Sequence, residues 1–216
     1  MRIIPMASKS GEDGFLELLQ QPEAALVLAS ASPRRLELLS LLGIPFEAVP
    51  SAAEENGNGD GRELVMGIAK AKCDDVFRRM PERFVLAADT LVCVDGLALG
   101  KPKDEKDAVS MLKRLSGRWH EVHTGICLQG AGGYFKLQAE TTKVEFAFLA
   151  DDMIHRYVRT GEPMDKAGAY AIQGISGIFI SRIEGSPSNV IGLPLERVRT
   201  MLEEAGFCIL SASENS

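Results

Sequence analysis

The chain has little of what would tie it to a membrane or to nucleic acid. No uninterrupted apolar run reaches the roughly 18 residues needed to cross a bilayer. The N-terminus also lacks a long apolar core followed by a small-residue cleavage site, so neither secretion nor membrane insertion is expected. Positive charge is scarce as well, since the net charge is −6. Because binding to polyanions needs a basic face, stable nucleic-acid binding is not expected, and any phosphate site must be local.

Cysteine is sparse and unpaired in its spacing. The four cysteines are far apart and include no Cys-x-x-Cys pair: Cys73, Cys93, Cys127 and Cys208. This spacing favours reduced thiols in a cytoplasmic protein over a disulfide framework or a structural zinc site.

Two stretches superficially resemble metal sites. His120 and His123 are three positions apart on an expected strand, where they would face opposite sides. Residues 56–61 are rich in Asn and Gly, as in a calcium-binding loop, but Gly67 stands where that loop needs a bidentate glutamate. We therefore expect no zinc site at the histidines and interpret residues 56–61 as a turn-rich loop.

The remaining chain has the composition and patterning of a folded α/β protein. Hydrophobic residues make up 45% of the 216 positions, which is ample for a core. Apolar periodicity and turn residues predict strands and helices in alternation. The expected strands are 25–30, 46–49, 84–88 with a continuation at 91–94, 119–128, 134–149 and 178–183, the 119–128 and 134–149 pair forming a hairpin that builds a second lobe. The expected helices are 12–21, 33–42, 63–80, 104–115, 151–159 and 195–205.

The stretch from Leu28 to Arg35 combines the end of an apolar strand with an abrupt helix start. Ser32 is a good N-cap, Pro33 suits the first helical position, and two arginines follow on the first turn. Free backbone N–H groups, hydroxyls and guanidinium groups would meet at this end, which suits phosphate oxygens. From these residues alone, an ordinary capped helix with solvated arginines remains the alternative.

Asp89 stands inside an apolar run, directly after the expected strand 84–88. An isolated buried carboxylate is costly, so this residue must be paired, metal-bound, protonated, or placed at an exposed strand end beside a cleft. Glu55 supplies a second carboxylate, and together the two fit a divalent cation such as Mg²⁺ or Mn²⁺. No Walker A loop and no dinucleotide-binding glycine pattern is present.

Six sequence blocks together resemble the Maf family of nucleoside triphosphate pyrophosphatases. They are SASPRR (30–35), AADT (87–90), GKP (100–102), LSGRWHEVHTG (115–125), DKAGAYAIQG (165–174) and NVIGLPL (189–195). The resemblance implies a two-lobed, mixed-sheet α/β fold with a central cleft, related to inosine triphosphate pyrophosphatases. It also implies a single Maf-like domain at 25–210, preceded by an extension at 1–24 that is partly disordered or a short helix, and followed by a tail at 211–216.

The resemblance further implies hydrolysis of a nucleoside triphosphate to the monophosphate and pyrophosphate, with a divalent metal ion as cofactor. The DKAGAYAIQG block resembles the branch that acts on dTTP and UTP. By position, Asp89 matches the proton acceptor, and Arg34, Thr90 and Gln173 match positions linked to substrate choice. The other matched pocket positions are Ser30, Arg35, Glu55, Lys72, Lys101 and Asp165, with Lys166 beside them.

Within these matches, the expected phosphate ligands are Ser30, Arg34, Arg35, Lys72 and Lys101, and the expected metal ligands are Glu55 and Asp89. Members of the family commonly pair, so a homodimer is compatible with the resemblance. The alternative functions are a nucleotide-binding regulator of septum formation with little turnover, and an enzyme acting on modified nucleotides.

Overall fold

The computed structural model describes residues 26–55 and 60–210. The expected helix at 12–21, the rest of the 1–24 extension, the 211–216 tail and most of the 56–61 loop lie outside these residues. The strands are β1 Leu26–Leu28, β2 Phe46–Ala48, β3 Phe84–Val94, β4 Leu97–Leu99, β5 Trp119–Gly130, β6 Tyr134–Phe146 and β7 Ile180–Glu184. The helices are α2 Pro33–Ser40, α3 Gly61–Arg79, α4 Glu105–Leu115, α5 Asp151–Val158, α6 Pro187–Ile191 and α7 Leu195–Glu204. Short 3₁₀ turns lie at η1 Ala131–Gly133, η2 Glu162–Asp165, η3 Ala167–Ala169 and η4 Ile175–Phe179.

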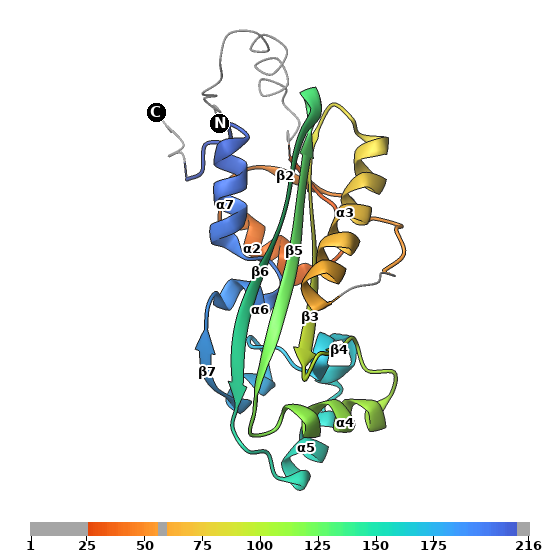
Figure 1. Ribbon diagram of the computed structural model, residues 1–216, viewed down its shortest axis with the longest axis vertical. Helices are drawn as coiled ribbons and strands as arrows, with labels where there is room; N and C mark the ends of the chain where they lie inside the picture. Colours follow the sequence, from red (N-terminus) through yellow and green to blue (C-terminus); the bar gives the residue numbers. More distant parts are fainter. Residues whose placement is uncertain (1–25, 56–59, 211–216) are drawn as a thin grey trace.

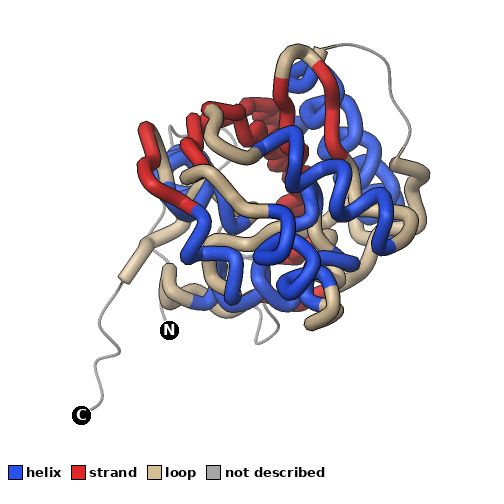
Figure 2. Tube along the Cα trace, turned by 90° about the horizontal axis from the view of Figure 1, so that it is seen from below, coloured by secondary structure: helices blue, strands red, loops and turns tan. Residues whose placement is uncertain are grey.

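One mixed sheet runs the length of the molecule, with strand order β2-β1-β3-β5-β6-β7 and with β4 paired to β3 (Figure 1). β1 is parallel to β2 and β3, whereas the pairs β3–β5, β5–β6 and β6–β7 are antiparallel. The strands lie together with helical segments packed beside them (Figure 2). The expected mixed α/β fold class is therefore confirmed.

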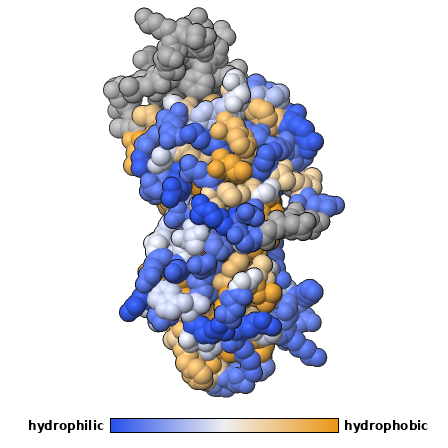
Figure 3. Space-filling model, in the orientation of Figure 1, coloured by the Kyte–Doolittle hydropathy of each residue, from blue (hydrophilic) through white to orange (hydrophobic). Residues whose placement is uncertain are grey.

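Two lobes form because the long strands β3, β5 and β6 carry separate apolar clusters on the same face of the sheet. In the lobe that holds α2 and α7, here the upper lobe, Leu86, Ile126 and Leu128 pack in one cluster. In the lobe that holds α4 and α5, the lower lobe, Val122 and Val144 pack in another. The molecule narrows between the lobes, and hydrophilic residues cover most of the face drawn (Figure 3).

Helix α3 covers the opposite face of the upper lobe. Ala69, Cys73 and Val76 of this helix pack against buried residues of β1, β3 and β5. Asp60 caps the helix by accepting from the backbone N–H groups of Arg62 and Glu63, at 3.0 and 2.9 Å. A well-specified start and a buried stripe thus fix the helix that carries Lys72 toward the cleft.

One sequence-based expectation about the strands is refined and another is wrong. The expected segments at 84–88 and 91–94 form one unbroken strand, β3, because Asp89 pairs with Gly125 of β5 and the backbone ladder is independent of the side chain. The β5–β6 hairpin does not build the lower lobe alone. It spans both lobes, from the Trp119–Glu145 pair to the Gly130–Tyr134 pair.

Candidate active site

A gap along one edge of β3 creates the site. β1 pairs with this edge at Phe84 to Leu86, and β4 pairs with it at Val92 to Val94. Among the described strands, none pairs with the same edge between these two segments. A cavity of about 640 Å³ opens at the gap, lined there by Asp89, Thr90 and Leu91. Asp89 is thus in the middle of a strand, yet it faces a cleft because the neighbouring strands stop on either side of it.

Asp89 is paired rather than isolated. Lys72 on α3 donates to Asp89 Oδ1 and to Glu55 Oε1, with both distances 2.7 Å. The residues Lys72 and Asp89 are buried, whereas Glu55 is exposed. The hydrogen bond from Lys72 is the largest influence that lowers the pKa of Glu55 below its ordinary value. Of the four ways in which the sequence allowed Asp89 to be buried, the structure shows ion pairing beside a cleft.

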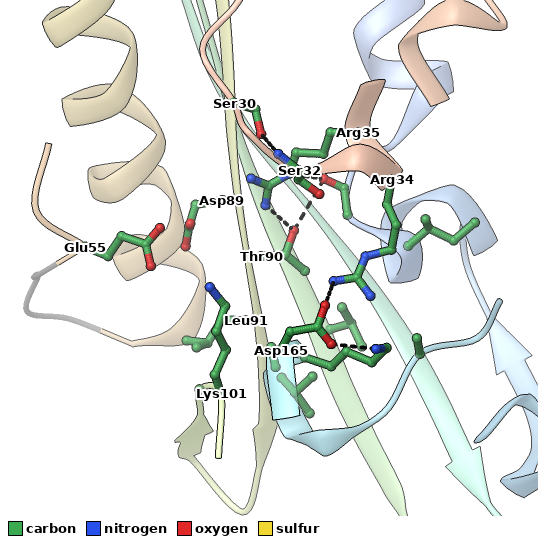
Figure 4. Close-up of a pocket in the computed structure, with 18 of the residues that line it drawn as sticks. Ser30, Ser32, Arg34, Arg35, Glu55, Asp89, Thr90, Leu91, Lys101 and Asp165 are labelled. Atoms are coloured by element: carbon green, nitrogen blue, oxygen red, sulfur yellow. Dashed lines mark hydrogen bonds and ion pairs between the residues drawn. The ribbon is translucent and has the colours of Figure 1, made fainter. Parts of the chain in front are cut away.

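The start of α2 forms the opposite wall, with its arginines directed into the cleft (Figure 4). Arg35 donates from Nε to the carbonyl of Gly192 at 2.9 Å and from Nη2 to Thr90 Oγ1 at 3.2 Å. Thr90 Oγ1 in turn lies 3.0 Å from Thr124 Oγ1. Burial lowers the pKa of Arg35, while the nearby Asp89 and Glu55 carboxylates act in the opposite direction. These contacts fix the guanidinium group before any ligand arrives.

Ser30 and Ser32 occupy the turn into α2, but Ser32 does not act as the expected side-chain cap. Its side chain makes no capping hydrogen bond; instead its backbone N–H donates to Ser30 Oγ at 3.1 Å. Pro33 occupies the first helical position, as expected. Ser30 is buried and lines the cavity, so the turn and both arginines lie on one cationic wall.

The lower lobe closes the cavity from the other side. Asp165 Oδ2 lies 4.0 Å from Arg34 Nη2 across the cleft, and Lys166 donates to Asp165 Oδ1 at 2.6 Å (Figure 4). The hydrogen bond from Lys166 is the main cause that holds the pKa of Asp165 below its ordinary value. Lys101 and Gln173 are exposed residues that also line the cavity.

All the pocket residues expected from the family resemblance line one cavity: Ser30, Arg34, Arg35, Glu55, Lys72, Asp89, Thr90, Lys101, Asp165, Lys166 and Gln173. Sequence reasoning missed an apolar part of the lining, to which Val92, Val122, Tyr170 and Val190 contribute. It also missed Gly192, whose carbonyl anchors Arg35. The block at 189–195 was visible in the sequence, but nothing in it indicated that a carbonyl oxygen would face an arginine.

The carboxylates suit a cation that the substrate helps to bind. Across residues 26–55 and 60–210, no group of three His, Cys, Asp or Glu side chains is arranged to hold a metal ion. Glu55 and Asp89 nevertheless supply two hard oxygen donors, and Mg²⁺ is commonly held by one or two carboxylates together with substrate phosphates. The donor set thus fits a divalent ion that shares its coordination with a polyphosphate.

The histidines separate as their spacing implies. His120 lies 2.8 Å from the hydroxyl of Tyr170, whereas His123 lies 2.9 Å from Thr141 on the other face of the sheet. Neither lines the cavity at Asp89.

In the described part of the chain, no helix combines the length and apolar character of a membrane span.

A family model described as "Maf-like protein" matches residues 25–205. The chain belongs to this family. Two relatives named dTTP/UTP pyrophosphatase are similar to this Maf-like chain over most of their length. The one from Thermococcus gammatolerans is 50% identical over 86% of this chain and 99% of its own. The one from Caldicellulosiruptor bescii is 44% identical over 86% of this chain and 96% of its own.

A solved structure shows the same fold at a much lower level of sequence similarity. The Ham1 protein of Staphylococcus aureus is 17% identical, with a TM-score of 0.52, covering 83% of this chain and 98% of that one. This likeness supports the fold and not the residues of the site.

Proposed function

We propose that this Maf-like protein hydrolyses nucleoside triphosphates, dTTP and UTP in particular, to the nucleoside monophosphate and pyrophosphate. The names of the similar proteins support this substrate class. The observation that carries the reaction is Asp89, a buried carboxylate beside Lys72 that faces the two arginines of α2 across one cavity. A base opposite a cationic wall is what attack by water on a bound phosphate requires.

In this proposal the chain's residues divide the work between binding and proton transfer. Arg34, Arg35 and Lys101 neutralise the triphosphate, and Lys72 stabilises charge at the attacked phosphate while its hydrogen bond holds the Asp89 carboxylate in place. Asp89 orients a water molecule and accepts its proton as the oxygen attacks the α phosphorus. The bond between the α phosphorus and the bridging oxygen to the β phosphate then breaks, and pyrophosphate leaves.

A divalent ion held by Glu55 and Asp89 would supply further neutralisation of the phosphate oxygens. The apolar side chains of Val92, Val122 and Val190 offer a surface for the nucleobase, and Gln173 and Thr90 lie where polar groups can read its edge.

The test is a panel of nucleoside triphosphates incubated with Mg²⁺ or Mn²⁺, with the release of monophosphate and pyrophosphate measured together. We expect dTTP and UTP to give the highest kcat/KM. The Asp89→Asn variant should lose about 10²- to 10⁴-fold in kcat because the general base is gone. An Asp89→Asn protein that stays folded and retains the wild-type rate would contradict the assignment of the base.

The same panel of nucleotides, with equilibrium binding measured beside product release, tests the second candidate, a nucleotide-binding regulator with little turnover. The pre-arranged Arg35, bonded to Gly192 and Thr90, is as useful for binding as for catalysis. Tight binding of a triphosphate without release of pyrophosphate would favour this second function.

A further inference from the structure

The loop that carries Gln173 is tied together by one buried hydroxyl. Ser176 is fully buried, and its Oγ accepts from the backbone N–H of Ala171 at 2.9 Å and donates to the carbonyl of the same residue at 3.0 Å. Residues 171 and 176 are therefore held side by side. Gln173 is presented at the exposed turn between them.

A carboxylate outside the cavity holds the same loop from behind. Glu162 Oε2 accepts from the backbone N–H of Ile175 at 3.0 Å, and Glu162 Oε1 accepts from the hydroxyl of Tyr157 at 3.2 Å. Glu162 Oε1 also lies 3.3 Å from Ser176 Oγ. None of Glu162, Tyr157 and Ser176 lines the nucleotide cavity. Their hydrogen bonds therefore stabilise the loop and do not face the cavity.

Two glycines make this close approach feasible. A Cβ atom at Gly174 would lie 2.2 Å from Glu162 Oε1, and one at Gly177 would lie 2.7 Å from the carbonyl oxygen of Ile172. The φ angle of Gly174 is −103°, so the glycine is needed here for space rather than for an unusual backbone conformation. The loop is built around the Glu162 carboxylate.

The turn that contains Glu162 also contacts the opposite wall of the cleft. η2 ends at Asp165, whose carboxylate lies 4.0 Å from Arg34 of α2 (Figure 4). Lys166 binds Asp165 and also donates from Nζ to the carbonyl of Glu162 at 2.5 Å. One short turn thus contacts both the Gln173 loop and Arg34, two positions on different lobes of the molecule.

We propose that Glu162 is a positioning residue for nucleobase selectivity, acting through the placement of Gln173. The inference rests on the proposed function and deepens it. The Gln173 amide can donate and accept side by side, which matches a base edge that presents an N–H group beside a carbonyl, as thymine and uracil do. Cytosine presents an acceptor nitrogen beside an amino group there, so a fixed amide orientation separates the two bases and a mobile one does not.

The experiment compares kcat and KM for dTTP and dCTP in the full-length chain and four variants. In Glu162→Ala, we expect the ratio of kcat/KM for dTTP to kcat/KM for dCTP to fall about tenfold, which corresponds to the loss of one hydrogen bond that distinguishes the two bases. The fall should come mainly from a higher KM for dTTP. The kcat for dTTP should stay within about twofold, because Glu162 touches no reacting atom. Glu162→Gln keeps one acceptor oxygen and should recover part of the preference.

The matched control is Asp152→Asn, which removes an acidic side chain from the same lobe. Asp152 is exposed on α5 and pairs with Arg156 one helical turn away. The Asp152→Asn variant should have the same preference for dTTP over dCTP as the wild type. Gln173→Ala sets the upper limit for the loss of dTTP preference. Misplacing the Gln173 amide in Glu162→Ala cannot reduce this preference more than removing the amide does.

Hydrogen exchange at the amides of Ala171 and Ile175 reports the loop directly. Exchange should quicken in Glu162→Ala and stay unchanged in Asp152→Asn. Faster exchange with an unchanged dTTP to dCTP ratio would make Glu162 merely structural and overturn the inference.

Should the wild type hydrolyse neither nucleotide, the proposed function fails, and equilibrium binding of dTTP and dCTP then tests the inference. Equal losses of both affinities in Glu162→Ala would overturn it, whereas a selective loss for dTTP would support it.

Discussion

Lys72 Nζ lies 2.7 Å from Asp89 Oδ1, and the two side chains are only 10% and 12% exposed. The same ammonium group lies 2.7 Å from Glu55, whose side chain is 59% exposed. One cation therefore serves two carboxylates, of which only Asp89 depends on it for burial. The Lys72–Asp89 pair links α3 to β3 at the open edge of the sheet, so we expect both the stability of the fold and the activity to depend on this contact.

Replacing Lys72 by Met should destabilise the fold and abolish activity. The change leaves Asp89 buried without its counter-ion, a situation that costs about 3–5 kcal/mol of unfolding free energy. Urea unfolding measures this loss. Lys70→Met, on the same helix, is the matched control, because the exposed Lys70–Asp74 pair contributes at most about 1 kcal/mol.

A double variant separates the two roles of Lys72. Lys72→Met combined with Asp89→Asn removes both charges and should recover much of the lost stability, but no pyrophosphate release. A single Lys72→Met protein as stable as Lys70→Met would show that Asp89 does not need this partner.

Glu55→Gln should weaken the use of the metal ion more than the fold. Glu55 is exposed and supplies one of two hard oxygen donors, so its loss should raise the Mg²⁺ or Mn²⁺ concentration for half-maximal pyrophosphate release about tenfold, equivalent to ~1.4 kcal/mol of binding. Glu105→Gln, on the exposed start of α4, is the control. Chelation by EDTA should abolish release in all three proteins, and release that survives EDTA would remove the metal ion from the proposal.

Gly125 and Gly67 offer opposite outcomes for the same substitution. A Cβ atom at Gly125 would lie 2.2 Å from the backbone oxygen of Val65, so Gly125→Ala must push α3 away from β5. We expect a loss of about 1–3 kcal/mol, together with lower activity because α3 carries Lys72. Gly67 lies on the exposed side of α3 with open space around its Cβ position, and Gly67→Ala should stabilise the protein by roughly 0.5–1 kcal/mol. Thermal unfolding of the two variants measures both effects, and equal shifts would contradict this account of the α3–β5 contact.

The sequence predicted the helices and strands better than it predicted which residues contact one another across the fold. The helix at 63–80 and the hairpin at 119–149 follow from periodicity and turn residues, and their observed bounds differ by only a few residues. The end of β3 at Val94 agrees with the sequence, but Asp89 lies inside one strand rather than between two segments, because a carboxylate in an apolar run resembles a strand end until its partner is known. Lys72 is 17 positions away and local pattern cannot pair the two.

The candidate site shows the same limit. The residues Arg34, Arg35 and Asp89 were predicted from their immediate neighbours in the sequence. A helix start is recognisable from a few residues, and so is a carboxylate within an apolar run, whose burial needs a partner. Arg35 depends on the Gly192 carbonyl, 157 positions away, and no side-chain pattern reveals a carbonyl oxygen. Contacts of this length come from the order of strands in the sheet, which single-residue chemistry does not specify.

His120 should make the protein less stable in acid. Burial lowers its pKa to about 4, against an ordinary value of 6.5. Between these values the unfolded chain binds one more proton than the folded chain, so the free energy of unfolding falls as the pH drops from about 6.5 to about 4. At 1.36 kcal/mol per unit, the full effect is about 3 kcal/mol.

His120→Gln removes this titration and keeps a side chain able to hydrogen bond to Tyr170, which lies 2.8 Å from the imidazole in the wild type. The variant should be less stable than the wild type at pH 7.5, because the ring also packs edge-on against Phe146 at a centroid distance of 5.0 Å. In urea unfolding at pH 7.5, 5.5 and 4.5 the gap between the two proteins should close as the pH falls. The same series on His155→Gln, where the histidine is exposed on α5, is the control for the same substitution outside the core. A gap between wild type and His120→Gln that stays constant with pH would show that His120 does not remain neutral in the fold, and that its contact with Tyr170 does not depend on an uncharged ring.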